Sequence, residues 1–130
     1  MKDINLNNSM QKALLIYIDI DSFNKAEKLE NSYEEFYSLV YSSGCEIEDS
    51  LKFKQKMPVT SSFISKGKID QIKDKLIDKD IELIIINHQL SASQNRNLEK
   101  ILSKRVIDKT ELILDIFASR ASSHIGKLQV

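Results

Sequence analysis

The sequence predicts an α/β fold with a small, mainly parallel sheet of about four strands flanked by helices. Short apolar runs rich in β-branched residues alternate along the chain with stretches of helical apolar spacing. The 130 residues include three Gly, one Pro and no Trp, a composition that argues against an all-β fold rich in turns. The 42% hydrophobic and 29% charged residues are usual for a globular domain with one core.

Two strands and one helix are predicted in the first half of the chain. Ala13–Ile20 is almost continuously apolar, as in a strand that is buried on both faces of a sheet. Ser32 and Glu35 form a capping-box pattern that opens a helix, and Gly44 stands where a helix often ends. Residues 45–54 alternate only in part between apolar and polar positions and are the second predicted strand.

The second half continues the alternation of helix and strand. Residues 69–77 carry an amphipathic stripe that predicts a helix. Residues 82–87 contain four consecutive apolar residues and are the clearest strand, which we expect to be central. Ser91 and Gln94 form a second capping box and open the next helix.

A short strand at residues 105–107 precedes a final helix whose start is marked by Asp108 and Glu111. That helix has apolar residues on more than one side and ends without a cap, which predicts that it was cut from a larger protein. We also expect the fragment to self-associate through residues 110–121.

The expected domain organisation has three parts. Residues 1–12 are polar and aperiodic and are predicted to be a flexible tail. Residues 13–109 form the α/β subdomain, and residues 110–130 begin a truncated helical subdomain.

Charge is distributed unevenly, although the net charge is zero. Residues 1–50 contain four Lys and ten acids, whereas residues 51–130 contain fifteen Lys and Arg and nine acids. A basic half permits contact with nucleic acid, but it is also compatible with an ordinary solvated surface. No apolar run is long enough for a membrane span and no secretory signal is present, so a cytoplasmic location is expected.

Polar residues follow the predicted strands, where parallel sheets usually bind ligands. This polar cluster comprises Asn87, Ser91, Gln94, Asn97, Asp108 and Thr110. The segment Ser65-Lys-Gly-Lys68 leads into a helix, and either its backbone amides hold a phosphate or it is a plain loop. Two roles are open to Arg96: contact with a phosphate, or an ion pair with Asp108.

Several classes of chemistry have no recognisable pattern in the sequence. The phosphate loop of nucleotide hydrolases is absent. His88 and His124 have no partner at metal-ligand spacing, so no metal site is predicted. The single cysteine, Cys45, is predicted to be a small buried hydrophobe. Because no catalytic motif is evident, the sequence leaves open whether this chain is itself an enzyme.

Three blocks in the second half carry a resemblance to a known family. They are residues 63–68, residues 87–99 with the order Leu-Ser-x-x-Gln-x-Arg-Asn-Leu-Glu, and residues 105–130. Together they resemble the N-terminal domain of the HflX family of ribosome-associated GTPases, over about residues 13–130. The chain departs from the family pattern at Ser65 for Gly, Asn87 for Asp, Ala92 for Pro, Lys109 for Arg and Ile125 for Glu.

The resemblance implies that a helical hairpin and a GTPase domain follow this subdomain in full-length relatives. GTP and Mg would belong to that missing GTPase domain, and no cofactor is expected in this chain. The family associates with the large ribosomal subunit, separates the ribosomal subunits, and turns its N-terminal region toward ribosomal RNA. The candidate contacts with RNA phosphates are Lys66, Gly67, Lys68, Arg96, Lys109, Arg120 and Lys127.

Two other functions are kept as alternatives. The first is an ATP or small-molecule site at the strand ends, built from Gly67, Lys68, Asn87 and Asp108. The second is a scaffold whose partner is the GTPase domain of the same protein, which it positions and restrains.

Overall fold

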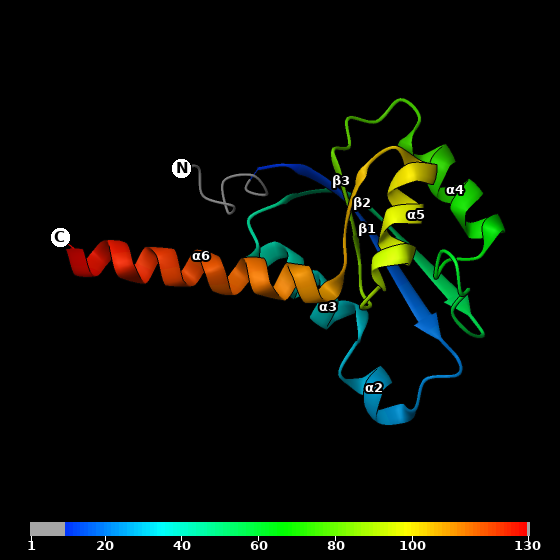
Figure 1. Ribbon diagram of the computed structural model, residues 1–130, viewed down its shortest axis with the longest axis horizontal. Helices are drawn as coiled ribbons and strands as arrows, with labels where there is room; N and C mark the ends of the chain where they lie inside the picture. Colours follow the sequence, from blue (N-terminus) through cyan, green and yellow to red (C-terminus); the bar gives the residue numbers. More distant parts are fainter. Residues whose placement is uncertain (1–9, 130) are drawn as a thin grey trace.

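The computed structural model describes residues 10–129, with side chains described as far as Ala121 (Figure 1). Its centre is a four-stranded sheet in the order β2-β1-β3-β4, and every neighbouring pair of strands is parallel. The predicted α/β class, with a small parallel sheet and flanking helices, is therefore confirmed. The strands are β1 (Lys12–Ile20), β2 (Glu46–Gln55), β3 (Leu83–Ile86) and β4 (Arg105–Ile107).

Helices cover both faces of the sheet. One core layer packs the side chains of Leu14, Ile16 and Ile18 against α4 and α5, and the other packs Ala13 and Leu15 against α3 and α6. This arrangement explains the continuous apolar run of β1, because alternate side chains enter opposite cores. The helices are α2 (Lys25–Leu29), α3 (Tyr33–Ser42), α4 (Lys66–Leu76), α5 (Ala92–Leu102) and α6 (Lys109–Gln129).

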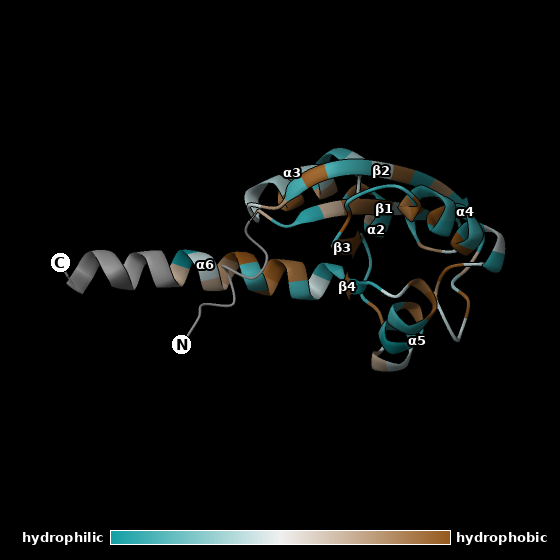
Figure 2. Ribbon diagram, turned by 90° about the horizontal axis from the view of Figure 1, so that it is seen from above, coloured by the Kyte–Doolittle hydropathy of each residue, from teal (hydrophilic) through white to brown (hydrophobic). Residues whose placement is uncertain are grey.

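The final helix reaches well beyond the sheet. Figure 2 shows hydrophobic residues gathered in the first turns of α6, next to β4, and along the inner strands. Leu112 and Ile116 of α6 are buried in the core that α3 shares, whereas Leu114 and Phe117 are 60% and 61% exposed. The apolar stripe predicted for this helix is thus buried only in part.

Most predicted helix starts are present in the structure. Ser91 accepts a hydrogen bond from the backbone N–H of Gln94, and the Gln94 side chain bonds back to Ser91. Asp108 accepts one from the backbone N–H of Glu111 in the first turn of α6. The short helix α2 was not predicted, since it has only five residues and buries none of them.

The chain order places a topological switch between β1 and β3. The connection from β1 leads to β2 on one side, and the connection after β2 crosses to β3 on the other side of β1. Helices α3 and α4, which form part of these connections, lie on opposite faces. In open parallel sheets the crevice beyond such a switch is the usual ligand site.

Side chains of α5 cover the outer edge of β4. Asn95 Nδ2 donates a hydrogen bond to the Val106 carbonyl oxygen at 3.1 Å, and Val106 N donates one to Glu99 Oε2 at 2.9 Å. Because both backbone polar groups of Val106 are satisfied in this way, the middle of this edge strand offers no free pairing groups.

Candidate functional site

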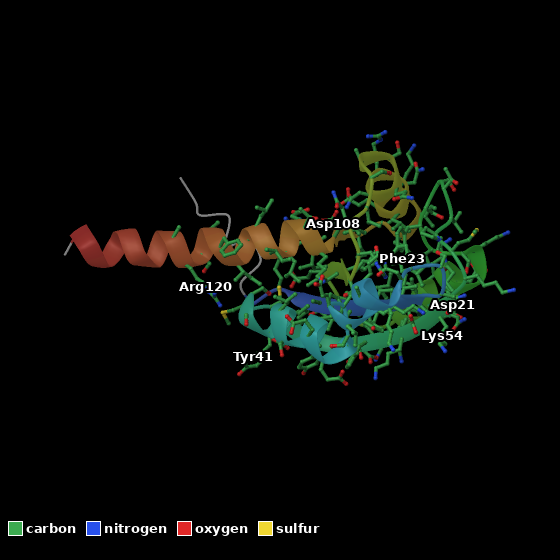
Figure 3. All side chains as sticks on the ribbon, turned by 90° about the horizontal axis from the view of Figure 1, so that it is seen from below. Asp21, Phe23, Tyr41, Lys54, Asp108 and Arg120 are labelled. Carbon is green, nitrogen blue, oxygen red and sulfur yellow. The ribbon has the colours of Figure 1, made fainter. Side chains whose placement is uncertain are left out.

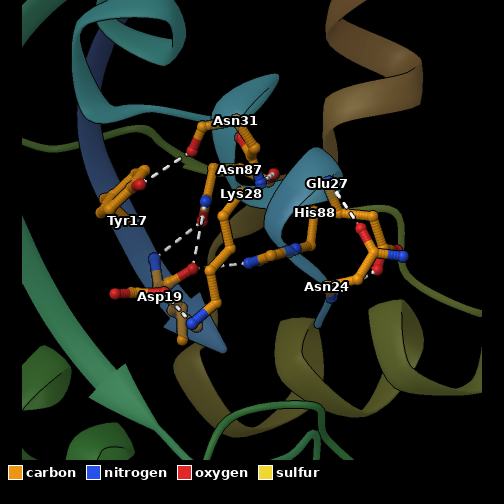
Figure 4. A network of polar contacts seen from close by, with 9 residues as sticks. Tyr17, Asp19, Asn24, Glu27, Lys28, Asn31, Asn87 and His88 are labelled. Carbon is orange, nitrogen blue, oxygen red and sulfur yellow. Dashed lines mark hydrogen bonds and ion pairs between the residues drawn. The ribbon is translucent and has the colours of Figure 1, made fainter. Parts of the chain in front are cut away.

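Asn87 lies at the switch between β1 and β3, completely buried (Figure 4). Its Oδ1 accepts a hydrogen bond from Ile18 N at 2.8 Å, and its Nδ2 donates one to the Ile18 carbonyl oxygen at 3.2 Å. The strand pairing between β1 and β3 ends at Ile16 and Ile86. The Asn87 side chain therefore extends the pairing beyond the end of β3 and holds the two strands together.

His88, the next residue, is 7% exposed and fills the crevice above the switch. Its Nε2 lies 2.6 Å from the Ile18 carbonyl oxygen and must carry a proton, since a carbonyl oxygen only accepts. Its ring packs against Phe23 and Phe63, with centroid distances of 5.3 and 5.0 Å. Burial lowers the pKa of His88, and the bond to Ile18 offsets part of that effect. The ring is thus a neutral packing group at pH 7.

The segment around α2 closes the same crevice from above. Asn31 Nδ2 donates a hydrogen bond to the Asn87 carbonyl oxygen at 2.9 Å, and Tyr17 donates from its hydroxyl to the Asn31 carbonyl oxygen at 2.7 Å. Lys109 Nζ reaches Asn31 Oδ1 at 3.4 Å. These bonds link β1, the segment that follows α2, and α6 over the end of β3.

Little space is left at this switch point. The cavity beneath α2, lined in part by Asp19 and His88, measures about 20 Å³, which is room for about one water molecule. An open hollow beside Lys109 measures about 200 Å³, smaller than usual small-molecule pockets of about 300 Å³ or more. In this conformation the chain's own residues occupy the place where a nucleotide would be expected.

The other predicted strand-end residues also bond mainly to backbone groups. Gln94 Nε2 donates to the carbonyl oxygens of Val59 and Thr60, each at 3.2 Å. Asn97 Nδ2 donates to the Ser61 carbonyl oxygen at 2.8 Å. These two residues of α5 therefore hold the loop that precedes α4.

Asp108 has a similar structural role. Its Oδ2 accepts a hydrogen bond from Leu90 N at 2.9 Å, while its Oδ1 caps α6. The ion pair considered between Arg96 and Asp108 is wrong, because both carboxylate oxygens of Asp108 accept backbone N–H groups and Arg96 is exposed on α5. Thr110 is exposed and its side chain bonds to no other described residue.

The basic candidates lie on two separate parts of the molecule. Lys66, Gly67 and Lys68 form the first turn of α4, and Arg96 lies on the neighbouring α5. Lys109 and Arg120 belong to α6, which covers the opposite face of the sheet (Figure 3). The side chain of Lys127 lies outside the described residues.

A cleft between α4 and α5 was missed by the sequence analysis. It has a volume of about 450 Å³, and two further lysines, Lys73 and Lys100, line it together with Lys66. The sequence spacing could have indicated part of it, because Lys66 and Lys73 are seven residues apart and so share one face of a helix. The lining residues are Val59, Ser61, Ser62, Lys66, Ile69, Asp70, Lys73, Asn97, Lys100 and Ile101.

Gln55, another residue that was missed, anchors the loop at one end of this cleft. It is 8% exposed, and its Nε2 donates hydrogen bonds to the carbonyl oxygens of Met57 and Phe63 at 2.7 and 2.8 Å. Its Oε1 accepts from Ser65 N at 3.0 Å. The start of α4 is therefore fixed to the end of β2 by one buried amide.

Within the part of the chain that the structure describes, no three His, Cys, Asp or Glu side chains gather in a way that suits a metal ion. Over the same residues, no helix has the length and apolar character required to cross a bilayer. Cys45 is buried, as predicted, and burial raises the pKa of its thiol.

Comparison with known proteins identifies relatives over most of the chain. Residues 30–118 match the family of GTP-binding GTPase N-terminal domains. The chain is 39% identical to the GTPase HflX of Escherichia coli (strain K12) over 120 residues, which cover 92% of this chain and 27% of the relative. It is 39% identical to the GTPase HflX of Alkalihalophilus pseudofirmus over 104 residues, which cover 80% of this chain and 25% of the relative.

Solved structures agree with this result. A crystal structure of a GTP-binding protein from the hyperthermophilic archaeon Sulfolobus solfataricus in complex with GDP matches with a TM-score of 0.58 and 30% identity, over 84% of this chain and 30% of that chain. A crystal structure of an SsGBP and GDP complex matches with a TM-score of 0.61. The chain spans about a quarter of the length of the two bacterial relatives. Because the family match covers most of the chain, the protein belongs to the GTP-binding GTPase N-terminal family, the N-terminal domain of HflX-type GTPases.

Proposed function

We propose that this chain is the ribosome-docking domain of an HflX-type GTPase and that it binds ribosomal RNA of the large subunit. The observation that carries the proposal is a contrast between two surfaces. At the strand ends the polar side chains bond to the chain's own backbone, whereas on α4 and α5 basic side chains are exposed. The described part of the domain therefore offers exposed positive charge for contact with a polyanion, which supports RNA binding.

In this proposal, GTP hydrolysis and its Mg ion belong to the part of the protein that the chain does not include. The relatives are about four times as long as the matched region and are named GTPases. Docking by this domain would orient the catalytic part on the large subunit, and separation of the subunits would follow from the activity of the whole protein in the cytoplasm.

The test is a filter-binding titration of the 130-residue chain with RNA extracted from large ribosomal subunits, repeated across a series of salt concentrations. Binding through phosphates makes the logarithm of the affinity fall linearly with the logarithm of the salt concentration, by roughly 0.7 for each phosphate contact with single strands. RNA affinity that is absent, or that is equal at low and high salt, contradicts the proposal.

A nucleotide site at the strand ends is the competing function. It would require α2 and His88 to move, since the cavity there measures about 20 Å³. Thermal unfolding with and without millimolar ATP or GTP separates the two functions, because a ligand that binds only the folded state raises the melting temperature. We expect no shift, and a clear rise with either nucleotide would favour the competing function.

A further inference from the structure

We propose that the cleft between α4 and α5 holds an unpaired segment of RNA, with the side chains of Lys66, Lys73 and Lys100 on its phosphates. This inference rests on the proposed function and locates it on one surface. It also separates the lysines that line the cleft from the other basic residues, since Arg120 of α6 has no contact in this cleft.

The lysines of the cleft are available for a ligand. All three are exposed, and none forms an ion pair with any described residue. The lysines that do form ion pairs, such as Lys75 and Lys79 with Asp49, lie elsewhere on the domain. Because these three charges have no ion-pair partner among the described residues, contact with phosphates would break no described ion pair.

The charges lie on both walls of the cleft. Lys66 and Lys73 belong to α4 and are two helical turns apart, roughly 10 Å along the axis, while Lys100 comes from α5. Asp70 is the one acidic residue in the lining. The lining thus has a net charge of +2, from three lysines and one aspartate.

Three apolar side chains, those of Val59, Ile69 and Ile101, also line the cleft. Ile101 is 41% exposed, although it is a large aliphatic side chain. A sugar or the face of a splayed base can pack against such apolar side chains, whereas a regular RNA duplex is contacted mainly through its phosphates and 2′-hydroxyls. The combination of apolar lining residues with lysines from both helices therefore favours an unpaired segment over a duplex.

The cleft is also built rigidly at one end. The loop that contributes Val59 and Ser61 is bonded to α5 through Gln94 and Asn97, and Gln55 holds the start of α4. A preformed cleft loses little conformational freedom when a ligand binds, and so more of the contact energy is available as affinity.

The decisive experiment compares two double variants of the 130-residue chain. Lys73→Gln with Lys100→Gln removes charge from both walls, while Lys25→Gln with Lys54→Gln removes two exposed lysines outside the cleft. Glutamine keeps a helix propensity close to that of lysine at positions 25, 73 and 100, and Lys54 is an exposed residue of β2. We therefore expect both variants to fold, as far-ultraviolet circular dichroism would verify. The probe is RNA extracted from large ribosomal subunits.

The measured quantity is the slope of the logarithm of RNA affinity against the logarithm of salt concentration. We expect the cleft variant to make this slope shallower by about 1.4, or roughly 0.7 for each lost contact, while the control changes it little. Asp70→Asn should act in the opposite direction and tighten RNA binding by about two- to five-fold, since it removes a carboxylate from between the lysines. Misfolding would not readily explain both a loss of RNA affinity in the lysine variant and a gain in the Asp70 variant.

Each failure has its own pattern. If the unaltered chain does not bind the RNA, the proposed function fails and this inference fails with it. If the chain binds but both double variants give the same slope as the unaltered protein, only the cleft assignment is overturned. If the cleft variant loses affinity for intact large subunits but not for protein-free RNA, the cleft contacts an acidic protein instead.

Discussion

Three amide side chains, of which those of Asn87 and Gln55 are buried, join parts of this domain. Asn87, Asn31 and Gln55 each bond to backbone groups of a neighbouring segment. An amide suits this task because it carries both a donor and an acceptor and needs no counter-ion. A carboxylate at position 87 could accept from Ile18 N but could not donate to the Ile18 carbonyl oxygen, so asparagine matches both groups.

Asn87→Ala should destabilise the domain by about 2–3 kcal/mol, because Ile18 N would be left buried without an acceptor. The matched control is Thr110→Ala at an exposed member of the same predicted cluster, for which we expect a change within about 0.5 kcal/mol. Urea unfolding followed by circular dichroism measures both. Equal stability of the two variants would show that Asn87 does not hold the strands together.

The candidate site illustrates which roles a sequence can indicate. Capping roles for Ser91 and Gln94 follow from spacing alone, since their hydrogen bonds are local. The bond from Gln94 to Val59 joins residues 35 positions apart, and that of Asn87 to Ile18 joins residues 69 apart. Such contacts depend on how the whole sheet is assembled, and no local pattern contains them.

At the scale of elements, β2 shows why the alternation of apolar and polar residues predicts a strand only incompletely. The pairing of β2 with β1 shifts register between Ala13 and Leu14, so that Ile47 and Asp49 become successive partners. Ile47 therefore packs toward α3 and α6, whereas Leu51 and Phe53 pack toward α4 and α5. A bulge moves later side chains to the other face, and so the apolar pattern of this strand looks irregular in sequence.

Gly67, in the first turn of α4, is a second point at which local structure can be tested. A Cβ atom added there would meet no atom within 4 Å. Gly67→Ala should therefore stabilise the domain by about 0.5–1 kcal/mol, through the higher helix propensity of alanine. Urea unfolding would reveal a loss of stability if the glycine were needed for the fold itself. Weaker RNA binding by a stabilised variant would indicate that the open space admits a ligand.

At the scale of the whole molecule, the order of strands and the faces taken by helices decide what is exposed. Strand number and parallel direction follow from the alternation of strand and helix. The order β2-β1-β3-β4 does not, because it is set by packing between segments distant in sequence. The same packing buries Leu112 and Ile116 of α6 but leaves Leu114 and Phe117 exposed.

We expect the isolated chain to self-associate through the exposed apolar side of α6. Leu114→Gln with Phe117→Gln should shift the protein toward monomer at concentrations where the unaltered chain forms larger species, as measured by light scattering. The matched control is Met57→Gln with Ile77→Gln, two side chains that are 63% and 62% exposed elsewhere on the surface. A monomeric unaltered chain at high concentration would contradict this prediction.

The hydrogen bonds of α5 to Val106 cover the β4 edge of the sheet, whereas the β2 edge has no such cover among the described residues. At the opposite border, β2 runs for ten residues and pairs on one side only, with β1, among the described residues. Growth of this sheet is consequently directional: any additional strand, from the same polypeptide or from another, would have to add alongside β2, because α5 obstructs the flank of β4.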